Sequence, residues 1–264
     1  MKKEQSSTLL TQSVTRALAI LSCFSDEEPE LRVIDFTRKL ALTQSNVSRL
    51  LNTMVSIGYV VRDESTGYYR LGPEIVSLGS IALNNYEIRK QAMPELYELE
   101  KRSGLDSNLA VIEGDSIFYL AHVDSYDSPR MYTFVGHRNP LHCTAIGKVL
   151  LAHLPLTEAR AHLNKPLHAY TENTITEPEQ IEKHLEAIKK QGYAMEWEEL
   201  KLGRACIAAP IFDRTGKVAA GISVSGVVSK FKPEQVEVLK DILIEMANRI
   251  SMRMGFITVG NKFI

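Results

Sequence analysis

The stretch LTQSNVSRLLNTM, residues 42–54, decides the fold because it predicts a short helix with two different faces. One face repeats apolar residues at helical spacing and must be buried: Val47, Leu50, Leu51 and Met54. The other face carries a cation and small hydrogen-bonding groups, with no acid among them: Ser45, Ser48, Arg49 and Asn52. An ordinary solvated face usually mixes glutamate with lysine. This one instead offers groups that base edges and phosphates accept.

A second amphipathic helix is predicted just before this stretch, over residues 32–40. The step from Ala41 to Thr43 breaks the pattern, and the Thr43 hydroxyl can cap the following helix. Two helices joined by a turn of three or four residues predict a helix-turn-helix over residues 32–54. A third helix, with Val14, Leu18, Leu21, Cys23 and Phe24 as its apolar residues, is expected to cover the other two.

A β-hairpin is predicted directly after the helix-turn-helix. Residues 59–62 and 68–71 favour strands, and residues 63–67 have turn chemistry. Three helices and a hairpin predict a winged helix over residues 10–72, with Arg62 and Arg70 on or near the wing. The predicted DNA-contacting residues are Thr43, Gln44, Ser45, Asn46, Ser48, Arg49, Asn52, Arg62 and Arg70. The alternative is a winged helix that contacts protein instead of DNA.

The whole chain of 264 residues suggests two domains, and its formal net charge of −1 does not oppose a local basic DNA surface. It contains no apolar run of the ~20 residues that span a bilayer, and its polar N-terminus lacks a signal-peptide core. The three cysteines, Cys23, Cys143 and Cys206, lack the spacing of a metal site or disulfide framework. We therefore expect a cytoplasmic protein without a metal or cofactor.

A linker helix is predicted over residues 73–86, between the winged helix and the rest of the chain. Ile75, Val76, Leu78 and Leu83 are apolar, and a single linker cannot bury them all. Two interpretations remain open: the helix pairs with a second copy of the chain, or it docks on its own domain.

The second domain, residues 87–255, has an α+β pattern. We expect strands at residues 108–112, 117–123, 131–135, 194–197, 206–211 and 218–224. Helices are expected at residues 145–153, after a capping box formed by Thr176 and Glu179, and around Val236 to Ile250. An antiparallel sheet between helices resembles a GAF- or PAS-type sensory module that holds a small molecule.

A ligand site is predicted where several polar groups come together in this domain. The first N–H groups of the helix at residues 144–147 attract carboxylate or phosphate. Ser223 and Ser225 alternate with Val224 and share a sheet face, with Cys206 and Glu196 in neighbouring strands. These groups suit an anionic, hydroxylated molecule. The competing interpretation is that the serines are merely solvated and Cys206 is a small core residue.

Ordered segments along nearly the whole chain resemble the IclR family of bacterial transcriptional regulators. They are QSVTRALAIL (12–21), SNVSRLLNTMVSIGYV (45–60), YYRLG (68–72), RNPLHCTAIGKVLLA (138–152), CIAAPIFD (206–213) and AAGISVSG (219–226). The resemblance implies a winged helix-turn-helix, a linker helix and an effector domain. It also implies dimers, often paired into tetramers, and control of catabolic operons by small organic acids.

The resemblance also implies which residues hold the effector: Ala145, Ile146, Glu196, Cys206, Ser223 and Ser225. With the rest of the helix start, the predicted effector site also includes Thr144 and Gly147. The family's glycine-rich helix start is Ala145-Ile146 here, so the bulkier Ile146 is expected to reshape the pocket. Residues 128–152 are most similar to the branch that senses sugar acids such as 2-keto-3-deoxygluconate.

The predicted function is a DNA-binding regulator, most often a repressor, bound to an operator as a homo-oligomer and controlled by an acidic metabolite. One alternative is an activator that responds to an aromatic or dicarboxylic acid. Another is an enzyme that uses Cys206 or a histidine as catalyst. No nucleophile motif surrounds Cys206, and His122, His137 and His142 lack metal-site spacing, so we do not expect an enzyme.

Overall fold

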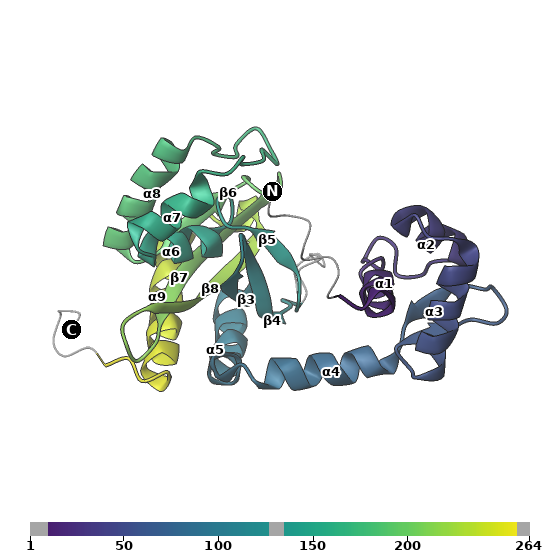
Figure 1. Cartoon of the computed structure of the whole chain (residues 1–264). Coiled ribbons are helices and arrows are strands. Elements are labelled where there is room, and N and C mark those ends of the chain that lie inside the picture. The colour runs from purple at the N-terminus through teal and green to yellow at the C-terminus, as the bar shows by residue number, and fades with distance from the viewer. Residues whose placement is uncertain (1–9, 127–134, 258–264) are drawn as a thin grey trace. The chain divides into compact units, whose positions relative to one another are not determined.

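The computed structural model describes residues 10–126 and 135–257 (Figure 1). The chain separates into two compact units, residues 1–85 and 86–264. Within the described ranges, no helix is both long enough and apolar enough to cross a membrane.

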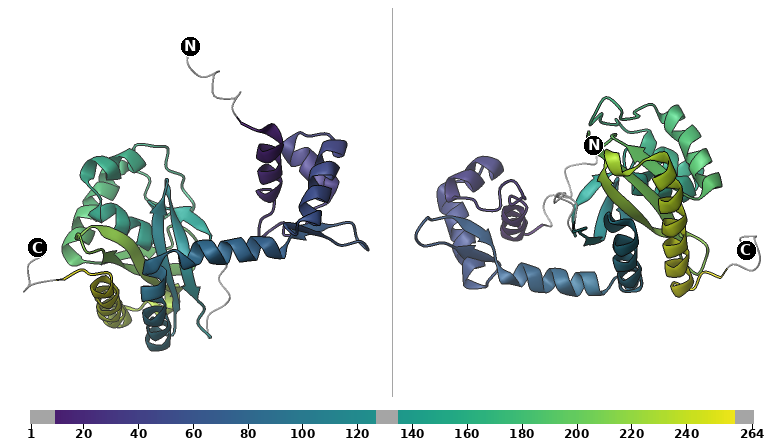
Figure 2. Two further views of the ribbon diagram at one scale, coloured as in Figure 1. Left: turned by 60° about the horizontal axis from the view of Figure 1, so that its bottom comes forward. Right: turned by 180° about the vertical axis from the view of Figure 1, so that it is seen from behind.

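The described part of the N-terminal unit, residues 10–85, contains three helices, a two-stranded hairpin and a fourth helix (Figure 2). They are α1 (Gln12–Leu21), α2 (Val33–Leu40), α3 (Gln44–Ser56), β1 (Val60–Arg62), β2 (Tyr69–Leu71) and α4 (Pro73–Asn84). The strands pair antiparallel. This arrangement confirms the predicted helix-turn-helix and the hairpin that follows it. In the turn, Ala41 adopts a left-handed conformation with φ 51°, which ends α2 and redirects the chain into α3.

The apolar faces of these elements form one core. Val47, Leu51 and Met54 of α3 are buried as predicted, together with Phe36 of α2 and Ile20 of α1, whereas Leu50 is only partly buried against this core. The prediction for α1 is partly wrong. Val14 and Leu18 are exposed, because α1 contacts the core through Ile20 and its neighbours, on another side of the helix.

The turn of the hairpin is fixed by its first residue. The Asp63 carboxylate accepts hydrogen bonds from the Ser65 N–H at 2.8 Å and the Ser65 hydroxyl at 2.6 Å. These bonds favour the charged form, and they lower the pKa of Asp63 to about 2. Side-chain caps of this kind are why aspartate is frequent in turns.

The C-terminal unit is a six-stranded antiparallel sheet with helices on both faces (Figure 1). Its strands, in the order β5-β4-β3-β8-β7-β6, are β3 (Asp106–Glu113), β4 (Ser116–Val123), β5 (Arg138–Pro140), β6 (Ala194–Trp197), β7 (Arg204–Phe212) and β8 (Val218–Val227). Its helices are α5 (Glu87–Ser103), α6 (Ala145–His153), α7 (Leu156–Leu163), α8 (Pro178–Gln191), the 3-10 helix η1 (Val228–Lys230) and α9 (Pro233–Arg253). The predicted α+β class is confirmed.

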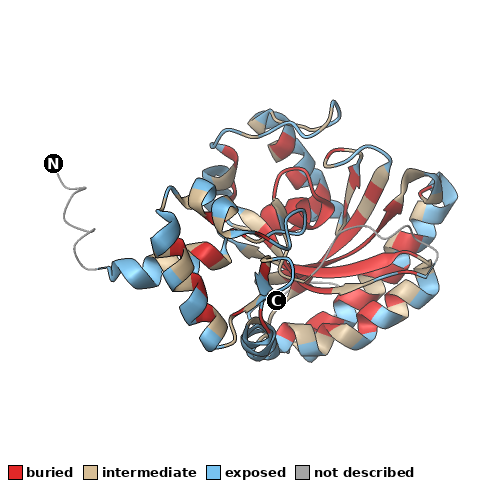
Figure 3. Cartoon of the chain, turned by 90° about the vertical axis from the view of Figure 1, so that its right-hand side faces the viewer, coloured by how far each residue is buried: buried red, intermediate tan, exposed pale blue. Residues whose placement is uncertain are grey.

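The two faces of the sheet have different partners. Helices α5 and α9 lie against each other and cover one face, whereas α6, packed on α8, covers the other. Figure 3 shows the central strands largely in the colour of buried residues. On β8, Ile222 and Val224 alternate with Ser223 and Ser225, so the two serines lie on the same face as Gly221. Ile146 of α6 packs against Gly221, so this is the face toward α6.

Several predicted details need correction. The capping box of Thr176 and Glu179 is wrong: α8 begins at Pro178 after Glu177, and no side chain caps it. Neither α7, whose apolar pattern is weak, nor β5, which has three residues and contains a proline, is predicted from the sequence. The predicted strand at residues 131–135 lies outside the described residues, apart from Val135.

Candidate functional site

Helix α3 presents the polar face predicted from the sequence. Ser45, Arg49 and Asn52 are exposed and Ser48 is partly exposed, while the opposite side of the helix is in the core. We call Ser45, Ser48, Arg49 and Asn52 the reading face. Arg49 therefore stands at the surface, where a guanidinium can reach a phosphate or a base edge.

The N-terminus of α3 is capped as predicted. The Thr43 hydroxyl accepts from the Asn46 N–H at 3.4 Å, and Gln44 is exposed beside it. The Asn46 side-chain oxygen lies 3.5 Å from Arg49 Nη2, which directs the guanidinium toward the start of the helix. The predicted DNA-contacting residues at Thr43 and along α3 are thus all exposed or partly exposed.

The two arginines of the hairpin do not share a face. Arg62 pairs with Tyr69 and its guanidinium lies 5.7 Å from the centre of that ring. Arg70 pairs with Val61, one position away, so its side chain leaves the opposite side of the hairpin. Arg62 also lies 3.6 Å from Glu64. The hairpin therefore offers its two cations in different directions.

A cavity of about 260 Å³ lies between the start of α6 and the sheet. We call it the sheet cavity. Fourteen of the described residues line it: Asn108, Tyr119, His137, Asn139, Thr144, Ala145, Ile146, Glu196, Leu200, Lys201, Arg204, Cys206, Ser223 and Ser225. Seven of the eight residues predicted from the sequence are in this set. Gly147 is outside it, and it has a packing role: a Cβ there would lie 2.1 Å from the Leu141 carbonyl oxygen.

The floor of the sheet cavity follows from strand register. Glu196 pairs directly with Cys206, and Cys206 pairs with Ser225, so one row of side chains crosses β6, β7 and β8. Ser223 pairs with Asn108 of β3 and extends the polar surface by one strand. Directly paired residues point to the same side of a sheet, so this row faces α6.

Asn108 organises the serines. Its Nδ2 donates to Ser223 Oγ and to Ser225 Oγ, each at 3.3 Å. On the other side, His122 Nδ1 lies 2.7 Å from Asn108 Oδ1, which fixes the orientation of the amide. Arg204 Nη2 donates to Ser225 Oγ at 2.9 Å. The serine hydroxyls are therefore held in place before any ligand arrives.

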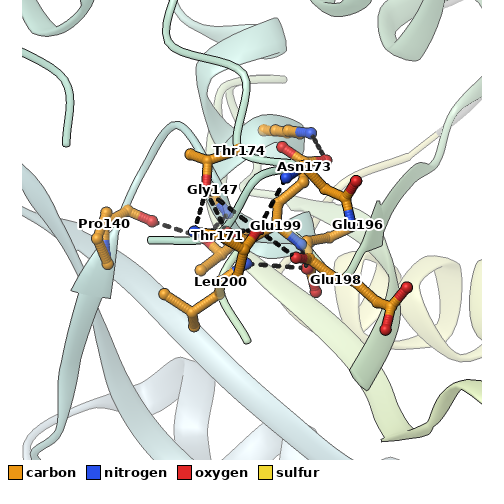
Figure 4. Close-up of polar contacts among 11 residues, drawn as sticks. Pro140, Gly147, Thr171, Asn173, Thr174, Glu196, Glu198, Glu199 and Leu200 are labelled. Carbon is orange, nitrogen blue, oxygen red and sulfur yellow. Dashed lines mark hydrogen bonds and ion pairs between the residues drawn. The ribbon is translucent and has the colours of Figure 1, made fainter. Parts of the chain in front are cut away.

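Glu196 is a buried carboxyl at the cavity wall (Figure 4). Its Oε1 accepts from the Glu199 N–H at 2.6 Å and from the Leu200 N–H at 3.2 Å. Burial nevertheless raises the pKa of Glu196, because removal from water penalises the charged form more than these two bonds favour it.

The segment after Glu196 is anchored from both sides. Thr171 Oγ1 donates to the Glu198 carbonyl and Thr174 Oγ1 to the Glu199 carbonyl, each at 2.6 Å (Figure 4). Beneath the segment, the Glu199 carboxylate forms a buried ion pair with Lys148 of α6. These contacts hold Leu200 and Lys201 at the edge of the sheet cavity.

The start of α6 supplies backbone donors. Thr144 caps the helix by accepting from the Gly147 N–H at 3.1 Å. In the described part of the chain, the N–H groups of Ala145 and Ile146 donate to no protein group. Both residues are buried and line the cavity, so their N–H groups are available to a ligand oxygen.

The electrostatics of Cys206 bear on the enzyme alternative. Burial, followed by the nearby Glu196 carboxylate, raises the pKa of the Cys206 thiol well above its usual range. A thiol must ionise to act as a nucleophile, so this environment disfavours covalent catalysis and leaves Cys206 as a polarizable contact. Burial likewise raises the pKa of Tyr119, across the cavity, to about 12. Among the described residues, no group of three or more His, Cys, Asp or Glu could hold a metal ion.

Sequence reasoning missed seven lining residues: Asn108, Tyr119, His137, Asn139, Leu200, Lys201 and Arg204. The alternation in β3 indicates that Asn108 and Ala110 share a face, and an asparagine among buried residues is a signal that could have been used. No pattern in the sequence indicates that Tyr119 and His122 of β4 lie on the same face of the sheet as Asn108. The register of β3 against β4 shifts between Leu109 and Ala110, which brings both to the same side although they are three residues apart.

The comparisons with known proteins agree with this arrangement. Residues 13–64 match the IclR helix-turn-helix domain, and residues 80–252 match the C-terminal domain of the bacterial transcriptional regulator IclR. The chain is 35% identical over 245 residues to the HTH-type transcriptional regulator KdgR of Escherichia coli, a match that covers 92% of this chain and 93% of that protein.

Two solved structures have the same fold over nearly their full length. The IclR of Thermotoga maritima has a TM-score of 0.80 at 32% identity, covering 92% of this chain and 99% of that one. An IclR homologue from Microbacterium hydrocarbonoxydans, complexed with 4-hydroxybenzoate, has a TM-score of 0.79 at 28% identity and covers 92% and 98%. The chain therefore belongs to the IclR family of bacterial transcriptional regulators, with a helix-turn-helix DNA-binding domain and a C-terminal effector-binding domain.

Proposed function

We propose that this protein is a repressor of a catabolic operon and that a sugar acid such as 2-keto-3-deoxygluconate, held in the sheet cavity, controls its binding to DNA. The observation that carries the proposal is the composition of that cavity. Backbone donors of Ala145 and Ile146, the hydroxyls of Ser223 and Ser225, and the Glu196 carboxyl surround one small volume. A linear molecule with a carboxylate and several hydroxyl groups matches this set of donors and acceptors.

The similarity to KdgR supports the sugar-acid class. Among the described residues that line the cavity, Tyr119 and His137 supply the aromatic rings. An aromatic acid is bound best between apolar and aromatic surfaces, whereas a polyhydroxy acid needs the hydroxyl, amide and carboxyl groups found here. We therefore favour a sugar acid over the aromatic or dicarboxylic alternative.

The DNA operator is the partner of the reading face. The helix-turn-helix geometry lays its second helix in the major groove, with its N-terminal residues at the base edges. Thr43, Gln44, Ser45 and Asn46 occupy that end of α3, and Arg49 and Asn52 follow one and two turns later. A regulator that acts on DNA works in the bacterial cytoplasm.

A homo-oligomer is proposed from α4. No residue of this helix is buried, and Val76 and Ile81 are 70% and 62% exposed. These values oppose the alternative in which the linker docks on its own domain. A second copy that covers the helix removes apolar surface from water, and two reading faces related by a two-fold axis match a palindromic operator.

Two experiments test the proposal. Selection from a random duplex library should yield a palindromic site, and affinity for that site should fall steeply as salt rises, through counterion release. A thermal-shift screen should then show stabilisation by 2-keto-3-deoxygluconate or a hexuronate, and not by 4-hydroxybenzoate. Failure to bind any selected duplex contradicts the DNA-binding half, and stabilisation by the aromatic acid alone contradicts the effector half.

A further inference from the structure

Arg204 is a cation at the cavity that neither the composition of the sequence nor the family resemblance singles out. It begins β7, shares the cavity-facing side with Cys206 two residues later, and lines the sheet cavity. Its Nη2 donates to Ser225 Oγ, but its Nε is buried and has no hydrogen-bond partner among the described residues. A buried donor without an acceptor is costly, so an acceptor supplied by a ligand is the group this site lacks.

The guanidinium also has no ion-pair partner within the described ranges. Asp106, which pairs with Ser225 in the sheet, is the nearest buried carboxylate in the strand register. Its Oδ1 accepts from the Ser125 N–H at 2.9 Å, its Oδ2 has no hydrogen-bond partner among the described residues, and it forms no ion pair with Arg204. Glu196 accepts from two backbone N–H groups instead. The charge of Arg204 is thus left for a ligand to balance.

We propose that Arg204 binds the carboxylate of the effector, with Ser225 and Asn108 as the residues that position the guanidinium. The proposal rests on the function proposed above. Arginine presents its donors in a planar fork that matches the two oxygens of a carboxylate, and Nε with Nη2 forms one edge of that fork. One hydrogen of Nη2 is held by Ser225, which leaves the second Nη2 hydrogen and the Nε hydrogen for the acid.

This assignment also orients the ligand. The start of α6 packs over Gly221 through Ile146, whereas Arg204 bonds to Ser225, four residues further along β8. At about 3.3 Å per residue, Gly221 and Ser225 are roughly 13 Å apart along β8, so the start of α6 and Arg204 lie toward opposite ends of the cavity. A linear acid cannot place one carboxylate at both ends. The full charge of an arginine attracts it more strongly than the half charge of a helix terminus, so the hydroxyl or carbonyl oxygens lie toward Ala145 and Ile146.

The test compares two ligands that differ in one charge: 2-keto-3-deoxygluconate and its methyl ester. Calorimetry on the full-length wild type should show that the ester binds roughly 10- to 100-fold more weakly than the acid, as expected for loss of a charge-assisted pair. Arg204→Met should weaken the acid by a similar factor and bring the ratio of the two affinities close to one. Arg204→Lys should restore part of the preference, because it keeps the charge without the fork.

The matched control is Arg138→Met, which removes an exposed cation of the same sheet that lies beside Glu113 and outside the cavity lining. This variant should keep the wild-type ratio. Thermal unfolding of each variant without ligand reports its folding.

The outcomes separate the two proposals. If Arg204→Met prefers the acid as strongly as the wild type does, the carboxylate binds elsewhere and the assignment is overturned, while the sugar-acid effector stands. If the folded wild type binds neither ligand, the effector class proposed above fails, and the role of Arg204 toward it fails as well.

Discussion

Glu196 and Cys206 face each other directly across β6 and β7, so a carboxyl group and a thiol share the cavity-facing side of the sheet. Burial raises the pKa of both groups, so each gives up its proton less readily than it does in water. The wall of the sheet cavity is thus a place where adding a negative charge is costly. Negative charge on a ligand is therefore favoured beside Arg204 and disfavoured beside Glu196 and Cys206.

The shifted pKa of Glu196 predicts a pH dependence of stability. A carboxyl whose pKa is higher in the folded protein contributes stability that is complete below the unfolded pKa and is lost as the pH rises through the folded pKa. The wild type should therefore lose stability relative to Glu196→Gln as the pH rises above the ordinary glutamate value of 4.5. Urea unfolding of both proteins across this range measures the difference.

Glu182 provides a control of opposite sign. Its hydrogen bonds to Arg160 lower the pKa of its carboxyl, so the wild type should gain stability relative to Glu182→Gln as the pH rises from acidic values toward 4.5, and the difference should stay constant above that value. A difference between the wild type and Glu196→Gln that stays constant with pH would refute the account of Glu196.

The buried pair of Lys148 and Glu199 predicts a non-additive response. Lys148→Met should cost ~3–5 kcal/mol of unfolding free energy, because it leaves the Glu199 carboxylate buried without its partner. The double variant Lys148→Met with Glu199→Leu should recover most of this loss. Lys240→Met, at an exposed pair with Glu237 one helical turn away, should cost at most ~1 kcal/mol. Equal losses at the two lysines would contradict the structure.

Close packing of Ile146 on Gly221 predicts a rescue. A Cβ at position 221 would lie 2.8 Å from Ile146 Cγ2, so Gly221→Ala should cost ~1–3 kcal/mol by overpacking. Adding Ile146→Ala should reduce that cost, since it removes the atom in the way. Gly79→Ala in α4 meets nothing within 4 Å and should stabilise by roughly 0.5–1 kcal/mol through helix propensity. Additive losses in the double variant would show that the two residues do not touch.

The reading face predicts two kinds of loss on DNA. Arg49→Ala should weaken binding to every duplex and reduce the slope of log affinity against log salt by about one. Ser45→Ala and Asn52→Ala should instead relax base preference, by roughly 1–3 kcal/mol where a bidentate contact is lost. Lys39→Ala, on α2 beside Glu28, is the control that removes a cation outside the reading face. Unchanged selectivity in both polar variants would place base recognition elsewhere.

The exposed apolar side chains of α4 predict dependence on a second copy of the chain. Val76→Glu or Ile81→Glu should shift the sedimentation of the wild-type oligomer toward the monomer, because each puts a charge where apolar surface is to be covered. Asn84→Glu, at the exposed end of the same helix, should not. A wild-type protein that sediments as a monomer would exclude the proposed oligomer.

The sequence predicts correctly the features that depend on residues close together in the chain. The two faces of α3, the Thr43 cap and the alternation of Ser223 with Ser225 depend on local sequence, and the structure confirms the cap and the alternation. The C-terminal sheet was predictable in kind for the same reason.

The sequence does not predict the position of a side chain when that position depends on pairing or contact with another segment of the chain. Tyr119 reaches the sheet cavity through a shift in strand register, and Arg204 through a bond to Ser225 in another strand. The exposure of Val14 and Leu18 is a related case: the pattern predicts an apolar face but not what covers it.

The most direct test of the central claim measures DNA affinity of the full-length wild type with and without 2-keto-3-deoxygluconate at fixed salt. A regulator whose sheet cavity controls its reading face should show coupling of ~1–3 kcal/mol, a change of roughly 5- to 150-fold, and saturating DNA should shift affinity for the acid by the same factor. An acid that binds the protein and leaves DNA affinity unchanged would contradict the account.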